Sequence, residues 1–88
     1  MIDVKAAVRI ALDYLQEFQE FVSAKGARLE ETEFDDAGYW LITLSTLEDE
    51  EGVLTTFIPT KRTYKRFVID AKTGEVKSMK VRTLQPID

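Results

Sequence analysis

The change from a helical to a strand-like hydrophobic period near Gly26 is the feature that most constrains the fold of this chain. Over residues 3–25, apolar side chains recur at steps of three, four and seven, as on an α-helix with one buried face. The stripe consists of Val4, Val8, Ala11, Leu15, Phe18 and Val22. Asp3 is a candidate N-cap and Gly26 a candidate stop. One amphipathic helix is therefore expected to precede all other structure.

Beyond Gly26, runs rich in aromatic and β-branched residues alternate with turn-forming residues, which predicts antiparallel strands. The expected strands cover about residues 28–34, 39–47, 53–58, 63–70 and 75–82. Gly74 suits the left-handed position of the last hairpin turn. A lone helix buries its stripe against one face of such a sheet, so we expect a two-layer α+β fold with a four- to five-stranded sheet. At 88 residues the chain fits a single domain over 1–88.

Alternation along the strands separates a core face from an outer face. The core set, expected under the helix, is Trp40, Ile42, Leu44, Phe67 and Ile69. The opposite face is half apolar, and its candidate interaction residues are Tyr39, Leu41, Tyr64 and Val68. Two alternatives remain: the last residues of the chain cover this face, or the strand register differs by one residue, which would invert every assignment.

Two segments resemble the small cystatin-like domains of the PepSY family: GYWLITLS and YKRFVIDAKTGEVKSMK. The more specific part is Phe67 to Val76, a strand that ends in an aspartate and leads into a Thr-Gly-Glu-Val turn. The resemblance implies a cystatin-like α+β fold. Typical PepSY domains are secreted or membrane-attached and are thought to modulate peptidases.

The composition excludes several chemistries. The chain has no His and no Cys, which removes the usual general base near neutral pH, the thiolate nucleophiles and the common zinc sites. The acids cluster at 30–36 and 48–51, where adjacent carboxylates usually form a solvated edge. We therefore expect no enzymatic activity, no catalytic residues, no metal and no cofactor.

Charge is segregated along the chain. Residues 28–52 carry one basic and nine acidic side chains, whereas residues 53–88 carry eight basic and three acidic ones. Either the acidic and basic strands pair within one sheet, or the basic side chains form a patch for phosphates or an acidic partner. The candidate patch is Lys61, Arg62, Lys65 and Arg66. We favour pairing, and we do not expect nucleic acid as a partner because a pI of about 4.8 repels its backbone at long range.

The N-terminus has charges spaced through it, so we expect no signal peptide, and no apolar run approaches the ~18–20 residues of a membrane span. A cytoplasmic location is expected. The favoured function is a protein-interaction module that acts through the outer face, as a homodimer or as an inhibitor or immunity-type binder. The alternative is a nucleic-acid-binding or small-ligand-binding domain of the NTF2 or cystatin type, although one helix leaves little room for a pocket.

Overall fold

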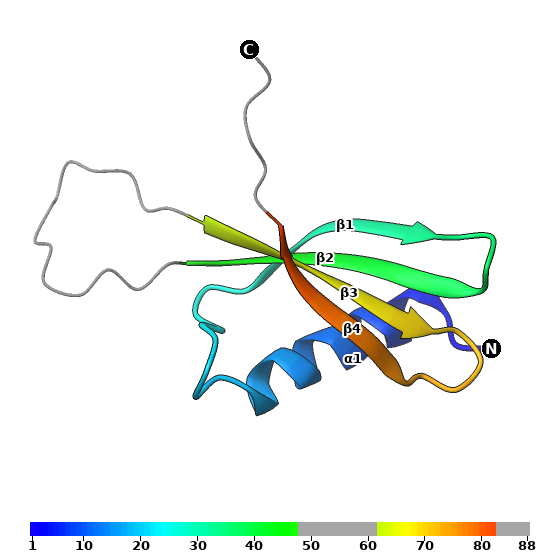
Figure 1. Ribbon diagram of the computed structural model, residues 1–88, viewed down its shortest axis with the longest axis horizontal. Coiled ribbons are helices and arrows are strands. Elements are labelled where there is room, and N and C mark those ends of the chain that lie inside the picture. Colours follow the sequence, from blue (N-terminus) through cyan, green and yellow to red (C-terminus); the bar gives the residue numbers. More distant parts are fainter. Residues whose placement is uncertain (48–61, 83–88) are drawn as a thin grey trace, which may run out of the picture.

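The computed structural model describes residues 1–47 and 62–82, and in them one helix precedes four strands. The elements are α1 (Val4–Glu17), β1 (Arg28–Phe34), β2 (Tyr39–Leu47), β3 (Arg62–Asp70) and β4 (Val76–Arg82). The strands form one antiparallel sheet in the order β1-β2-β3-β4, and α1 runs along one face of it (Figure 1). The predicted α+β fold, with an N-terminal helix on an antiparallel sheet, is confirmed. The strand predicted at 53–58 lies outside the described residues.

The core lies between α1 and the middle of the sheet. Seven side chains of this cluster are fully buried, and they are Ala7, Ala11, Leu15, Ile42, Leu44, Phe67 and Ile69. The two alanines allow the helix to approach the sheet closely, while the ring of Tyr14 meets Phe67 edge-on at a centroid distance of 6.0 Å. Trp40 is half-buried, and its Nε1 donates a hydrogen bond to the Ile2 carbonyl at 3.0 Å. The predicted core face is therefore correct.

The helix ends earlier than its hydrophobic period predicts. We expected it to reach residue 25, but α1 ends at Glu17, and Phe21 is 80% exposed. Tertiary hydrogen bonds redirect the chain: the Leu47 amide donates to the Lys25 carbonyl at 2.8 Å, and the Ser23 hydroxyl donates to the Leu47 carbonyl at 2.8 Å. These bonds attach the segment after the helix to the end of β2, which a continuing helix could not reach.

Two turning points match the sequence. The Asp3 carboxylate accepts a hydrogen bond from the Ala6 amide at 2.9 Å and caps α1. Gly74 has φ = 78° in the turn between β3 and β4, and its amide donates to the Asp70 carbonyl at 2.8 Å. Only a residue without a side chain adopts this left-handed conformation at little cost.

The helix covers the sheet unevenly. Leu29 and Phe34, on β1, remain 47% and 44% exposed. An open groove of about 680 Å³ runs between α1 and β1, with Val4, Val8 and Leu12 on its helical wall. The space between helix and sheet is thus a groove along the edge strand. Within the described residues, no helix combines the length and the apolar character needed to cross a membrane.

Candidate interaction surface

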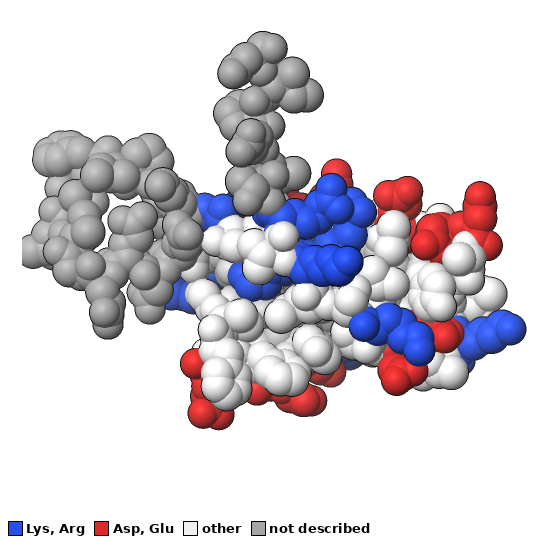
Figure 2. All heavy atoms as spheres, in the orientation of Figure 1, with Lys and Arg blue, Asp and Glu red and all other residues white. Residues whose placement is uncertain are grey.

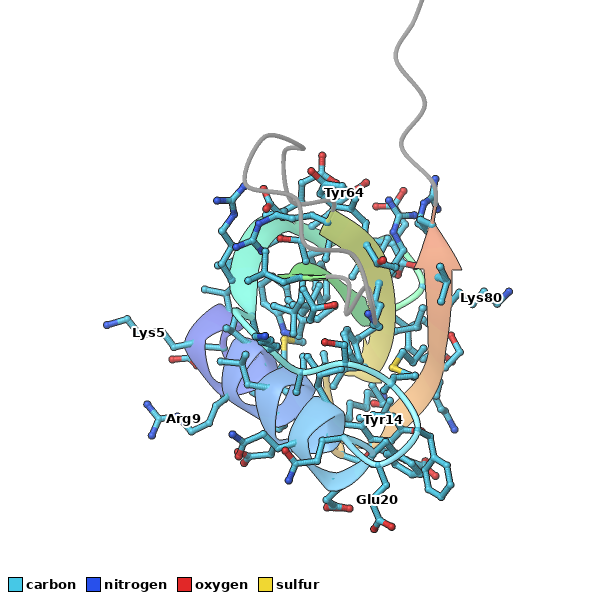
Figure 3. The ribbon with its side chains drawn as sticks, turned by 90° about the vertical axis from the view of Figure 1, so that its left-hand side faces the viewer. Lys5, Arg9, Tyr14, Glu20, Tyr64 and Lys80 are labelled. Carbon is cyan, nitrogen blue, oxygen red and sulfur yellow. The ribbon has the colours of Figure 1, made fainter. Side chains whose placement is uncertain are left out.

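The outer face is the side of the sheet that points away from α1. Tyr39, Leu41, Tyr64 and Val68 alternate with the core residues of β2 and β3, so the sheet brings all four of them to the outer face. Leu41 lies directly opposite Val68, and each of the four side chains is half-buried. Figure 3 shows Tyr64 on the opposite side of the sheet from the helix. The four residues share a face, but only Leu41 and Val68 form a directly opposed pair.

The predicted basic patch is divided by the same alternation. Arg62 and Arg66 lie on the outer face, whereas Lys65 points to the helix side and is only 2% exposed. The Lys65 Nζ donates a hydrogen bond to Thr46 Oγ1 at 2.8 Å. Grouping Lys65 with a surface patch was wrong, because neighbouring residues of a strand point to opposite faces. Lys61 lies outside the described residues.

Two further basic residues, which were not among the predicted ones, complete the patch. Lys80 lies directly opposite Arg66, and Arg82 lies directly opposite Tyr64. Figure 3 shows Lys80 projecting from β4, and Figure 2 shows Lys and Arg side chains gathered around the end of that strand. The sequence contained a signal for them, because Lys80 and Arg82 alternate with apolar residues. Once the register of the hairpin is known, this alternation places both of them on the outer face.

The side chains of Arg66, Lys80 and Arg82 line a hollow of about 370 Å³ on the outer face. Leu41, Val68 and Ser78 contribute apolar surface and a hydroxyl. The two ion pairs found in the described part of the chain, Arg28 with Glu30 and Lys77 with Glu75, involve none of the three cations. The Arg66 Nε is buried and has no hydrogen-bond partner within residues 1–47 and 62–82. The basic hollow, as we call it, therefore combines positive charge with a donor that an anion would satisfy.

The topology contradicts direct pairing between the acidic and basic strands. The acidic residues Glu31 and Glu33 lie on β1, at one edge of the sheet, while Lys80 and Arg82 lie on β4, at the other edge. β2 carries no charged residue and separates β1 from β3. Figure 2 shows acidic side chains along β1 and Lys and Arg side chains gathered at the end of β4. Pairing of these edges within one chain is therefore not the reason for the basic hairpin.

One link across the sheet does exist, and it runs through Ser45. Arg62 donates to Ser45 Oγ at 2.8 Å, and the Ser45 hydroxyl donates to a carboxylate oxygen of Glu30 at 2.6 Å. The same oxygen accepts a hydrogen bond from Arg28 Nε at 2.7 Å. The hydrogen bond from Ser45 and then that from Arg28 lower the pKa of Glu30 below its ordinary value of 4.5. This chain of contacts holds Glu30 ionised at the end of the outer face.

The described acidic residues do not converge on a common point. Asp35 Oδ1 accepts hydrogen bonds from the Ala37 and Tyr39 amides, both at 3.0 Å, and so shapes the turn between β1 and β2. No group of three or more metal-ligating side chains is placed to hold an ion in the part of the chain that the structure describes. The acidic stretch at 48–51 lies outside that part.

Comparison with known proteins yields no relative: no protein-family model, curated protein or solved structure matches this chain.

Proposed function

We propose that this protein is a non-enzymatic interaction module that binds a carboxylate-bearing protein surface through the outer face of its sheet. The observation that carries the proposal is the direct opposition of Arg66 and Lys80 beside the apolar pair Leu41 and Val68. Like charges placed directly opposite each other destabilise a sheet. A bound carboxylate would remove this repulsion and would give the Arg66 Nε an acceptor. The apolar pair beside it supplies the surface that such a contact needs to exclude water.

The same surface favours protein carboxylates over nucleic-acid phosphates. The basic hollow contains three cations, but the whole chain has a net charge of −4 and an acidic edge at β1. A nucleic acid presents many phosphates in a row and would meet this acidic edge, whereas a protein side chain can enter the hollow alone.

We also propose a cytoplasmic location and a cystatin-like relationship. The absence of Cys is compatible with a reducing compartment. The order of one helix followed by an antiparallel sheet supports the cystatin-like relationship. The resemblance to PepSY domains concerns the fold, and it does not identify a binding partner for this chain.

Affinity capture from nuclease-treated lysate of the native host, combined with the native mass of the purified chain, tests the proposed function. We expect association with a protein, either another one or a second copy, and loss of that association in Leu41→Glu. Phe21→Glu is the matched control because it makes the same chemical change at a residue 80% exposed after the helix. Association that survives Leu41→Glu would contradict the proposal, and association that disappears with nuclease treatment would replace it with nucleic-acid binding.

A further inference from the structure

Charge changes sign from one edge of the outer face to the other. In the central row, Glu31 on β1 pairs with Thr43, Thr43 with Arg66, and Arg66 with Lys80 on β4. The next row runs from Glu33 through Leu41 and Val68 to Ser78. Both of these rows begin with a carboxylate, and the second has an apolar pair in its middle. A third row runs from Arg28 through Ser45 and Tyr64 to Arg82, and its Arg28 forms an ion pair with Glu30 at 2.7 Å. The β1 edge of this face thus has a net negative charge, from Glu30, Glu31 and Glu33 against Arg28, while Lys80 and Arg82 make the β4 edge basic.

We propose that the partner of the outer face is a second copy of this chain, packed sheet against sheet around a twofold axis parallel to the strands. This inference rests on the proposed function of the outer face and adds the identity and orientation of the partner. A twofold axis between β2 and β3 reverses the strand order of the facing sheet, so that β1 of each copy lies over β4 of the other. Glu31 then faces Lys80 of the second copy, and Leu41 faces Val68, within the ~30° rotation usual for packed sheets.

The charges disfavour the other symmetric arrangements. A twofold axis perpendicular to the strands would place β1 over β1 and bring Glu31 and Glu33 against their own copies. Edge-to-edge pairing of two β4 strands would likewise bring Lys80 and Arg82 together. Facing like charges oppose association, and charged side chains on edge strands prevent edges from pairing. Of these arrangements, the axis parallel to the strands is the one that places Glu31 of each copy opposite Lys80 of the other.

The dimer also accounts for the basic hollow. In the single chain, the hollow brings Arg66, Lys80 and Arg82 together, and the Arg66 Nε has no acceptor within the described residues. In the dimer, β1 of the second copy passes over this region and supplies carboxylates to it. The basic β3–β4 hairpin thus lies against the acidic strand β1 of the second copy. Between two copies, β2 does not keep the acidic strand away from the basic strands as it does within one chain.

Charge reversal and mixing test the dimer in the intact 88-residue chain. Native mass spectrometry and sedimentation should show a dimer for the wild type. Both Glu31→Lys and Lys80→Glu should weaken dimerisation by at least about tenfold, because each places like charges at positions 31 and 80 at both edges. An equimolar mixture of the two variants should form a heterodimer, since the acidic edges of one variant meet the basic edges of the other. Recovery on mixing also shows that each variant remains folded.

Two helix variants serve as matched controls. Glu17→Lys and Lys5→Glu reproduce the respective changes in net charge at exposed positions of α1, and both should remain dimeric. In Figure 3, Lys5 and Arg9 point away from the sheet. A wild type that stays monomeric at about 1 mM would overturn the dimer. So would a dimer that survives both sheet variants, or a failure to reassociate on mixing. If a monomeric wild type still captures another protein through Leu41, the identity of the partner is wrong and the outer-face function stands.

Discussion

Arg66 and Lys80 lie directly opposite each other across β3 and β4, on the face of the sheet that the helix leaves uncovered. The ion pairs of the described residues include neither of them. Two positive charges in this position repel each other in the isolated chain and attract an anion together. Arg66 and Lys80 therefore affect both the stability of the fold and binding at the outer face. A substitution that relieves their repulsion should also weaken binding at that face.

Lys80→Glu should raise the free energy of unfolding of the monomer by about 0.5 kcal/mol, because an opposite-charge pair replaces a like-charge pair across the two strands. Urea unfolding followed by the fluorescence of Trp40, extrapolated to low protein concentration, measures this gain without a contribution from association. The same variant should lose outer-face binding.

The control for this effect is Lys77→Glu. Lys77 forms an exposed ion pair with Glu75 at 3.1 Å, so its reversal removes an attraction and should bring no gain in stability. A loss of stability in Lys80→Glu equal to that in Lys77→Glu would show that the opposition of Arg66 and Lys80 has no energetic consequence.

Lys65→Glu should lower the free energy of unfolding by about 3 kcal/mol, because it places a carboxylate where a buried ammonium now donates to Thr46. Arg66→Glu, the neighbouring residue on the outer face, should change it by less than about 1 kcal/mol. Thermal and urea unfolding of the two variants side by side provide the comparison. Equal losses would be inconsistent with the opposite orientations of these two side chains.

Glu30 should make stability depend on pH in the acid range. Its pKa in the folded protein is lowered by the hydrogen bonds from Ser45 and Arg28, so the ionised carboxylate stabilises the fold above its ordinary value of 4.5. This contribution disappears as the pH falls from 4.5 through the lowered pKa. Glu30→Gln should therefore be less stable than the wild type at pH 7, and the two should converge at low pH.

Titration of the Glu30 carboxyl by NMR measures this directly. Ser45→Ala should raise the pKa of Glu30 toward 4.5, because it removes the largest of the lowering contributions. An unchanged pKa in Ser45→Ala would show that the hydroxyl does not hold the carboxylate ionised.

Much of the fold follows from hydrophobic period alone. The alternation in β2 and β3 correctly identified Ile42, Leu44, Phe67 and Ile69 as core residues, because strand side chains point alternately to two faces. The same rule, applied to the basic residues, would have separated Lys65 from Arg66. Reading those charges as one cluster was the error, since adjacency in a strand sequence separates side chains in space.

The end of the helix required information from distant residues. The apolar period of α1 continues past Glu17, but the contacts of Ser23 and Lys25 with Leu47 turn the chain toward β1. The local hydrophobic pattern contains no information about such hydrogen bonds, because their partners lie more than twenty residues away in sequence.

The helix, the strand-forming segments and the division of most residues between core and outer face follow from the sequence alone, because these features depend on the local hydrophobic period. The strand order became known from the three-dimensional structure, and with it the separation of the acidic β1 from the basic β4 at opposite edges of the sheet. Strand order depends on which backbones pair, and neither composition nor charge count specifies that. Through this order, an uneven distribution of charge along the chain becomes a face with an acidic edge, an apolar centre and a basic edge.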